Sequence, residues 1–405
     1  MDSPVTIAAC AAITALGDGL PPLERALVHN TGGLRPCARF SGRNYQTDVV
    51  GAVPDELWNQ LREETPGYTN APAFLLANHV LRQLRRNVTG RLGLVLSTTK
   101  ADILALERVQ AGQPCSEAAR RHILPGQLAA DLAAANDIRG PVRCVSVACV
   151  SGLLALQTGA ELLLHNAADA VIVVGVDLLS HFVLAGFTAL KSLDPDGCRP
   201  FDKDRVGLSL GEGAGAILLT HGVVASVSDA AVDVFPAAGT AATTPNLPLC
   251  IAGWGSSNDA NHLTGPSRDG SGLALAMERA LRKAGRTPGE VDYVHAHGTG
   301  TLYNDTMEAL ALRRIFGERI PPFSSSKGML GHTLGAAGIL ETILCVLAAQ
   351  TDTVPGTPRL RTPAADMPAS LQLTPQRGVK LRTLLKINAG FGGTNAALML
   401  EQPKP

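Results

Sequence analysis

The residues of this 405-residue chain that are best suited to covalent chemistry are one cysteine and two histidines far apart in the sequence. Cys149 stands in the stretch Val-Ala-Cys-Val-Ser-Gly, and His297 and His332 each adjoin a glycine. A thiolate can attack a carbonyl carbon, while imidazole N–H groups can stabilise the developing oxyanion or move protons. We therefore expect nucleophilic thiol chemistry at a site that these three residues share.

The neighbours of Cys149 predict where its sulfur lies. An apolar run from Val142 to Ala148 precedes the cysteine and a helical segment, Leu153 to Leu164, follows it, so Cys149 should lie at a strand-to-helix junction. The unpaired N–H groups in the first turn of a helix favour an anion. We therefore expect the Cys149 thiol to be shifted towards the thiolate.

Two plainer interpretations of these residues stay open at this point. A cysteine in apolar surroundings is often merely buried, and a single histidine is often a hydrogen-bonded structural residue. His295 would point to the opposite side of an extended chain from His297, so we expect it to be structural. Cys149, His297 and His332 could together bind zinc, but the sequence has none of the local ligand spacing of a structural zinc site, and we expect no metal.

Short apolar runs that alternate with helical patterns predict an α/β protein. Strands are predicted at Val5–Leu16, Leu92–Leu96, Val142–Ala148, Ala170–Val176, Ala216–Thr220, Leu249–Trp254, Val291–Val294 and Leu381–Ile387. Helices are predicted at Leu20–Val28, Phe74–Leu84, Gly272–Ala284 and Leu334–Ala349, besides the one after Cys149. The alternation restarts after a Thr/Ala/Pro-rich passage, Gly239–Pro248, which predicts two halves, residues 1–247 and 248–405.

Composition excludes several classes of partner and compartment. The formal net charge is zero, so no overall field attracts nucleic acid or an anionic membrane surface. Eight cysteines without a CxxC pair are typical of reduced thiols. The first residues lack the basic segment of a signal peptide, and Val5–Leu16 is too short to span a bilayer. We expect a cytoplasmic protein that binds no nucleic acid and has no integral membrane segment.

Six motifs make the chain resemble the elongating, Cys-His-His type of β-ketoacyl-ACP synthase in the thiolase superfamily. They are ACVSG (148–152), RPFDKDR (199–205), GEGAG (211–215), HGTGT (297–301), SKG with GH (326–328 and 331–332) and GFGGTN (390–395). They stand in family order and cover nearly the whole chain. The resemblance implies a thiolase-like α/β fold in which two similar α/β halves pack as a five-layer αβαβα sandwich.

The resemblance also implies a role for each matching catalytic residue. Cys149 would accept the acyl chain from acyl carrier protein as a thioester. His297 and His332 would bind the thioester carbonyl of malonyl-ACP and stabilise the enolate that forms as carbon dioxide leaves. The backbone N–H groups of Cys149 and Phe391 would hold the second oxyanion, and Phe391 would act as a gate. The chemistry implies no metal or redox cofactor.

Supporting residues and partners follow from the same resemblance. Lys327, paired with Glu341, would support the catalytic residues from behind, as would Asp305 and Glu308. Thr299 and Thr301 would contact the pantetheine arm. Because acyl carrier protein is acidic, Lys203 and Arg205 are candidate contacts at the pocket mouth. The family is dimeric, so we expect either a homodimer or a heterodimer with a second ketosynthase-like chain.

The chain departs from the family pattern around the expected cavity. Where Asn-x-Phe usually precedes GFGG, this chain has Ile387-Asn388-Ala389, so a methyl group replaces an aromatic ring and should reshape the cavity. STTKAD (97–102) stands where the family usually has a glycine-rich strand end, and this would place Thr98 near the acyl chain. LYND (302–305) likewise replaces the usual Pro-Leu-Gly-Asp. These changes resemble ketosynthases of aryl polyene, flexirubin and xanthomonadin pathways and imply aryl or conjugated polyenoyl chains bound near Ala389 and Thr98.

Three rival interpretations concern related proteins. A degradative thiolase would need a second reactive cysteine where GFGG stands, and an initiating synthase would carry Asn in place of His332. A non-catalytic partner subunit, like the chain-length factors that pair with active ketosynthases, would lack the nucleophile that Cys149 supplies. This last interpretation stays open as the alternative to an active synthase, because the motifs around the pocket are unusual.

Overall fold

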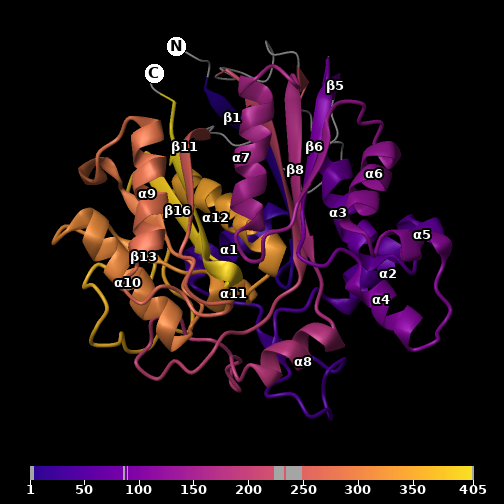
Figure 1. Cartoon of the computed structure of the whole chain (residues 1–405), viewed down its shortest axis with the longest axis horizontal. Coiled ribbons are helices and arrows are strands. Elements are labelled where there is room, and N and C mark those ends of the chain that lie inside the picture. The colour runs from indigo at the N-terminus through magenta and orange to yellow at the C-terminus, as the bar shows by residue number, and fades with distance from the viewer. Residues whose placement is uncertain (1–3, 85–86, 89, 223–231, 234–248, 404–405) are drawn as a thin grey trace.

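A mixed β-sheet runs through the whole molecule (Figure 1). The computed structural model describes residues 4–84, 87–88, 90–222, 232–233 and 249–403. Across these residues the strands follow one another in the order β13 (Phe323–Ser324), β12 (Tyr293–His295), β16 (Thr383–Ala389), β17 (Thr394–Glu401), β11 (Leu249–Asn258), β1 (Val5–Thr14), β9 (Gly213–His221), β8 (Ala170–Asp177), β6 (Leu92–Ser97) and β7 (Val142–Val145). The predicted α/β class is confirmed.

The sheet consists of two halves with the same arrangement of strands. They meet where β1 pairs with β11, through Val5↔Ile251, Thr6↔Cys250 and Ile7↔Leu249. Counted outwards from this junction, each half has two antiparallel pairings followed by two parallel ones, in the order β1-β9-β8-β6-β7 and β11-β17-β16-β12-β13. The two similar halves are thus confirmed. The predicted seam at Gly239–Pro248 lies outside the described residues, so the boundary at 247/248 stays a prediction.

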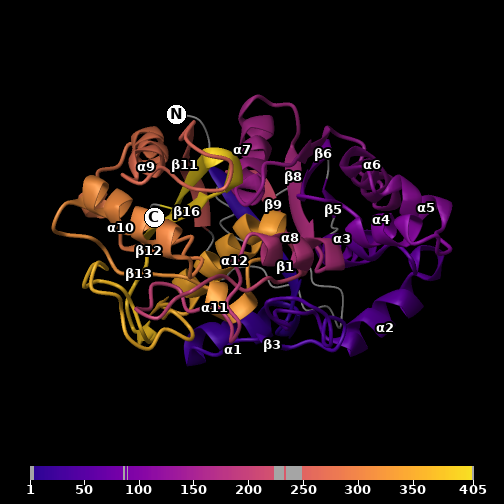
Figure 2. The same cartoon turned by 60° about the horizontal axis from the view of Figure 1, so that its bottom comes forward.

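Helices complete the five predicted layers. The central helices α7 (Ser151–Leu164) and α12 (Ala337–Gln350) contact strands of both halves, whereas α3 (Pro72–Leu84) and α9 (Ser271–Ala284) cover the outer faces. Figure 2 shows α7 and α12 between the two halves, with α6 (Pro125–Ala135) and α10 (Leu302–Phe316) at opposite ends. Every residue of α12 before Gln350 is buried, which fits its largely apolar sequence, in which Glu341 and Thr342 are the polar exceptions.

The remaining short elements lie around this frame. The helices are α1 (Leu20–His29), α2 (Asp55–Glu64), α4 (Ile103–Gln110), α5 (Glu117–Arg121), α8 (His181–Ala189) and α11 (Lys327–Leu330). Short strands are β2 (Gly17–Asp18), β3 (Arg35–Pro36), β4 (Val49–Val50), β5 (Asn87–Val88), β10 (Val232–Asp233), β14 (Thr353–Val354) and β15 (Gln376–Arg377). Within the described ranges, no helix has both the length and the apolar character needed to cross a membrane.

The two central helices cross at a pair of glycines. A Cβ atom built on Gly152 of α7 would lie only 2.7 Å from the Cα of Gly338 of α12, so the two backbones are in direct contact. Cys149 lies two residues before α7, and His332 lies five residues before α12. The close crossing therefore brings the beginnings of both helices, and with them two of the predicted reactive side chains, to one place.

Most predicted elements are found within a few residues of their expected bounds, but β7 differs. The apolar run Val142–Ala148 predicted a buried strand, whereas β7 ends at Val145 and two of its residues are exposed. The reason is its position, because β7 is the outermost strand and, among the residues that the structure describes, β6 alone pairs with it. The prediction of a strand covered on both faces is therefore wrong for β7. The predicted helix at Leu334 also begins with a 3-10 turn, Leu334–Ala336.

Candidate active site

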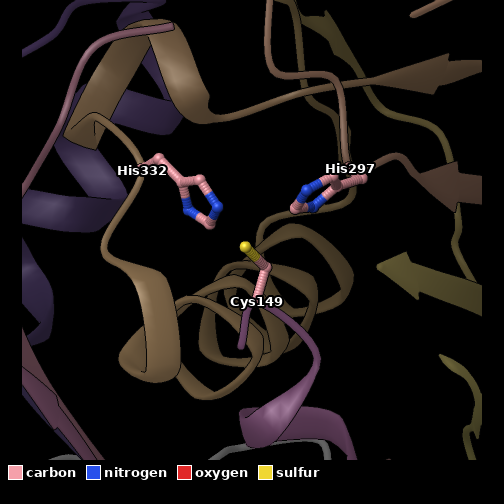
Figure 3. A group of neighbouring side chains, drawn as sticks. All are labelled: Cys149, His297 and His332. Atoms are coloured by element: carbon pink, nitrogen blue, oxygen red, sulfur yellow. The ribbon is translucent and has the colours of Figure 1, made fainter. Parts of the chain in front are cut away.

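The cysteine and the two histidines converge although they come from three separate segments (Figure 3). The Cys149 sulfur and one ring nitrogen from each histidine all lie within 4.8 Å of one another. The rings of His297 and His332 stand edge to face, with centroids 5.2 Å apart. All three side chains are buried. The three residues that the sequence analysis singled out thus form one cluster.

A strained turn sets the direction of Cys149. Ala148 has a φ of 44°, a left-handed conformation that costs a residue other than glycine about 1–3 kcal/mol. The Ser151 side chain holds the turn, because its Oγ accepts the Val147 N–H at 2.7 Å and donates to the Ala148 carbonyl at 2.7 Å. The turn ends β7 and starts α7, so Cys149 lies at the predicted strand-to-helix junction.

The protonation state of Cys149 differs from the sequence expectation. Burial raises the pKa of the thiol to about 11, although the charge of Lys327 and a hydrogen bond from the Phe391 backbone N–H act to lower it. The prediction that the helix N-terminus shifts this residue to the thiolate is therefore wrong for the resting protein. Desolvation of an anion in this closed site outweighs the stabilising N–H groups. Cys149 rests as a thiol at neutral pH.

Both histidines are neutral and present the same nitrogen to the cluster. Burial, followed by the charge of Lys327, lowers the pKa of each imidazole well below its ordinary value. The Leu334 N–H donates to Nδ1 of His332 at 3.2 Å, and Asn388 Nδ2 donates to Nδ1 of His297 at 3.0 Å. Because each Nδ1 accepts, the single ring proton resides on Nε2. Across the described residues, His332 Nε2 has no hydrogen-bond partner and is free to donate to a substrate.

This hydrogen-bond pattern bears on the zinc alternative. Cys149, His297 and His332 offer atom types that zinc binds, and these atoms are close together. A histidine that binds metal usually donates its other N–H outwards, leaving a bare lone pair for the ion. Here the outer nitrogens accept hydrogen bonds instead. The arrangement therefore fits two N–H donors aimed at a substrate oxygen better than it fits metal ligands.

The loop that carries His297 is held by two carboxylates from α10. Glu308 accepts the N–H of His297 and of Gly298, each at 2.6 Å. Asp305 accepts the N–H of Thr299 at 3.1 Å, among other backbone groups. Burial raises the pKa of Glu308 to about 7, and burial also raises the pKa of Asp305. Both acids thus lie directly behind the loop after β12 and fix the backbone position of His297.

A buried group of charges lies behind both histidines. The carboxylate of Glu341, on α12, binds the ammonium groups of Lys327 and Lys386, the second at 2.8 Å. Burial acts to raise the pKa of Glu341, but the two lysines hold it well below its usual range. The family resemblance pairs Lys327 with Glu341, but no motif includes Lys386. A lysine inside the apolar run of β16 was the available signal, because a buried lysine needs a charged partner.

A cavity of about 430 Å³ leads from the surface to the cluster. Its lining includes Cys149, His297, His332, Thr299, Thr301, Ala389 and Phe391. The ring of Phe391 stacks on Phe187, with centroids 5.9 Å apart. Thr98 does not line this cavity. It is buried beside β8, where its hydroxyl donates to Asp177 Oδ1 at 3.3 Å.

Of three further predicted positions, only Arg205 has different surroundings from those expected. Arg205 is buried and lies 3.7 Å from both Asp305 and Asp366, so it cannot reach a carrier protein, and that prediction is wrong. Lys203 is exposed and pairs with Asp204 at 3.0 Å. His295 is buried, with Nδ1 3.1 Å from the Ala296 carbonyl, as a structural histidine would be.

Comparison with known proteins agrees with this geometry. The curated protein 3-oxoacyl-[acyl-carrier-protein] synthase 2 of Coxiella burnetii is 30% identical over 98% of both chains. The solved ishigamide ketosynthase/chain length factor covers all of both chains with a TM-score of 0.86 and 27% identity. The ketosynthase ApeO in complex with its chain length factor ApeC from Xenorhabdus doucetiae gives a TM-score of 0.77 and 28% identity, covering 99% of this chain and 98% of that one.

Family profiles match both halves of the chain. The profile described as Beta-ketoacyl synthase, N-terminal domain, matches residues 83–224, and the one described as Beta-ketoacyl synthase, C-terminal domain, matches residues 249–361. The first range contains the cysteine of the cluster, and the second contains both histidines. The chain belongs to the β-ketoacyl synthase family.

Proposed function

We propose that the protein is an acyltransferase, a β-ketoacyl-ACP synthase, that condenses malonyl-ACP with an acyl group held on Cys149. The observation that carries this proposal is the convergence of one thiol with two Nε2–H donors at the end of a cavity. Relatives named 3-oxoacyl-[acyl-carrier-protein] synthase over the full length of the chain support it.

The first half-reaction transfers the acyl group. The Cys149 sulfur attacks the thioester carbon of acyl-ACP, the carbon–sulfur bond to the pantetheine breaks, and the thiol proton ends on the pantetheine sulfur. The negatively charged oxygen of the tetrahedral intermediate would accept hydrogen bonds from the backbone N–H groups of Cys149 and Phe391. The Phe391 N–H already faces the Cys149 sulfur, which supports this role.

The second half-reaction forms the new carbon–carbon bond. The bond between the malonyl carboxylate and its α-carbon breaks, carbon dioxide leaves, and the electron pair forms an enolate. His297 and His332 donate their Nε2–H groups to the enolate oxygen. The α-carbon then attacks the Cys149 thioester, and the cysteine sulfur leaves with its electron pair and takes up a proton from water, which restores the resting thiol. Thr299 and Thr301, on the cavity wall, would contact the pantetheine arm.

The direct test is the intact mass of the protein after mixing with acyl-ACP. The native chain should gain the mass of one acyl group, and Cys149→Ala should gain none. The native chain should then release 3-oxoacyl-ACP when malonyl-ACP is added. An acyl adduct that persists in Cys149→Ala, or a native chain without one, would exclude Cys149 as the acyl carrier.

The alternative is a partner subunit of low or no activity, similar to a chain length factor. Two similar solved structures contain a ketosynthase together with such a factor. The intact nucleophile and the two correctly protonated histidines favour an active subunit here. A native chain that acquires no acyl group by itself, but raises the activity of a second ketosynthase-like chain, would establish the alternative.

We further propose that the acyl chain is aryl or conjugated polyenoyl, which is flat and rigid. Ala389 and Cys149 line the same cavity, and a methyl group where the family usually has an aromatic ring occupies less of it, which supports a bulkier, rigid acyl chain. The native protein should extend a polyenoyl-ACP faster than a saturated acyl-ACP of equal length. Ala389→Phe should reduce this preference. Faster extension of the saturated primer by the native protein would refute the proposal.

We also propose an acidic acyl carrier protein and a second ketosynthase-like chain as partners. The outward edge of β7 supports the second partner, because it leaves backbone groups available for pairing. A cytoplasmic location fits the eight cysteines, all of which are free thiols in the structure.

A further inference from the structure

We infer that Asn388 is a positioning residue, which makes His297 an Nε2–H donor and is itself oriented by Glu341 and Lys386. The inference rests on the proposed function, because it concerns the step in which His297 stabilises the enolate. Asn388 does not line the cavity and would not touch substrate. Its effect would pass through the histidine alone.

The first support is the contact between the two side chains. Asn388 is fully buried at the end of β16, with Nδ2 3.0 Å from Nδ1 of His297. An amide nitrogen can only donate, so Nδ1 must accept and the ring proton must lie on Nε2. For His332 the same tautomer is fixed by the backbone N–H of Leu334. A backbone N–H cannot be exchanged for an acceptor, whereas a side-chain amide can be rotated.

The second support is the group that prevents this rotation. With the amide turned by half a turn, its oxygen would accept from Nδ1 of His297, and Nε2 would lose its proton. Glu341 Oε2 lies 3.2 Å from Asn388 Nδ2 and would repel the oxygen in that position. Lys386 binds the same carboxylate oxygen at 2.8 Å. Lys386, which has no part in the catalytic steps, therefore keeps the Glu341 carboxylate ionised and in place.

The third support is that the amide is directed wholly towards these two partners. Within the described part of the chain, Asn388 Oδ1 is buried and has no hydrogen-bond partner, so both contacts of the side chain are made by Nδ2. An unpaired buried carbonyl is destabilising. The orientation of the amide is therefore set by Glu341 and His297 and not by a partner of its oxygen.

The test replaces the amide by a carboxyl group of the same shape. In Asn388→Asp the ionised carboxylate accepts from Nδ1–H, so neutral His297 has no proton on Nε2. Decarboxylation of malonyl-ACP at pH 8 should fall by about 10²-fold, the usual effect of losing one oxyanion donor. The rate should recover as the pH falls towards 6, because protonation of the imidazole or of the new carboxyl restores an Nε2–H donor. Acylation of Cys149 by acyl-ACP should keep its native rate.

Two controls separate positioning from general damage. Asn136→Asp places a carboxyl on another buried asparagine, which bonds Asn78 and the Leu132 carbonyl, and it should keep the native pH profile. Asn388→Leu should lose decarboxylation at every pH. A native pH profile in Asn388→Asp, or equal losses in acylation and decarboxylation, would overturn the inference.

A spectroscopic measurement tests the inference independently of activity. The ¹⁵N chemical shifts of His297 should report an unprotonated Nδ1 in the native protein and a protonated Nδ1 in Asn388→Asp. If the native protein neither acylates Cys149 nor decarboxylates malonyl-ACP, the proposed function fails while the shifts still decide the tautomer. An Nδ1–H signal from native His297 would refute the positioning role.

Discussion

At the scale of single residues, Cys149 combines a reactive position with a high pKa. Its sulfur faces two imidazoles and the Phe391 N–H, yet burial keeps it protonated at rest. The donors around it are therefore arranged for negative charge on substrate oxygens more than for a resting thiolate. This distinguishes the site from cysteine hydrolases in which a neighbouring imidazole takes the thiol proton, because here both Nε2 atoms already carry one.

The high pKa predicts how alkylation of Cys149 depends on pH. The thiolate is the species that iodoacetamide attacks, and its fraction increases about tenfold per pH unit below the pKa. The rate of inactivation by iodoacetamide should therefore keep rising from pH 7 to pH 10. Other free thiols, such as exposed Cys144, also react with iodoacetamide, so peptide mass spectrometry should show that the loss of activity follows the modification of Cys149. A rate that is already constant above pH 7 would mean that the thiolate predominates at rest.

The motifs predicted the reactive residues but not the groups that set their protonation. Cys149, His297 and His332 stand in recognisable stretches, whereas Lys386 and Asn388 are single polar residues at the end of an apolar run. Their partner Glu341 is 45 residues from Lys386, and only the packing of α12 against β16 brings them together. Arg205 shows the reverse error, because its charge indicated exposure and its ion pairs bury it.

At the scale of elements, the crossing of α7 and α12 determines how closely Cys149 and His332 approach. Gly338→Ala tests it, because the new Cβ would lie 2.6 Å from the Leu153 backbone nitrogen and would force the helices apart. We expect the free energy of unfolding in urea to fall by about 1–3 kcal/mol, as in other overpacked cores, and condensation to slow.

Gly126→Ala is the matched control for that crossing. Gly126 is also in a helix, α6, but a Cβ there would meet no atom within 4 Å. This change should leave condensation unaltered and slightly raise stability, since alanine is the better helix former. Equal behaviour of the two variants would show that the close helix crossing is not required.

A second element-scale prediction concerns Asp102, whose carboxylate joins two helices. It accepts the Ala105 N–H in the first turn of α4 at 3.1 Å and the Ala73 N–H in the first turn of α3 at 3.2 Å. Burial raises its pKa from 3.8 to about 7, more than these bonds and Arg108 lower it. The folded state therefore binds this proton more tightly than the unfolded chain does.

The stabilising effect of that proton should be complete below about pH 4 and disappear by about pH 8. Relative to Asp102→Asn, which does not titrate, the native protein should lose up to about 4 kcal/mol of unfolding free energy over this range. Urea unfolding of both proteins at several pH values provides the comparison. If the unfolding free energy of the native protein minus that of Asp102→Asn stays constant or increases with pH, the raised pKa of Asp102 is contradicted.

At the scale of the whole molecule, the duplicated architecture explains where the site lies. The two halves place α7 and α12 at equivalent positions, each after the outermost strand of its half, β7 or β13. Alternating strand and helix patterns predicted this repetition. They could not predict that β7 would be an edge, because an apolar strand has the same sequence pattern whether its second neighbour is in the same chain or in another.

The edge strand gives the last prediction, that β7 pairs with a second ketosynthase-like chain. Pro141 and Val145 bond inwards to β6, since their carbonyls accept the N–H groups of Leu94 and Thr98. Backbone groups alternate in direction along a strand, so the N–H of Cys144 points away from the sheet. Cys144→Pro removes that one donor and spares the bonds to β6. It should convert the proposed dimer, of this chain with a second copy or with another ketosynthase-like chain, to monomers in light-scattering measurements, whereas Cys144→Ala, which keeps the N–H, should remain dimeric. A dimer that survives the proline would place the interface elsewhere on the molecule.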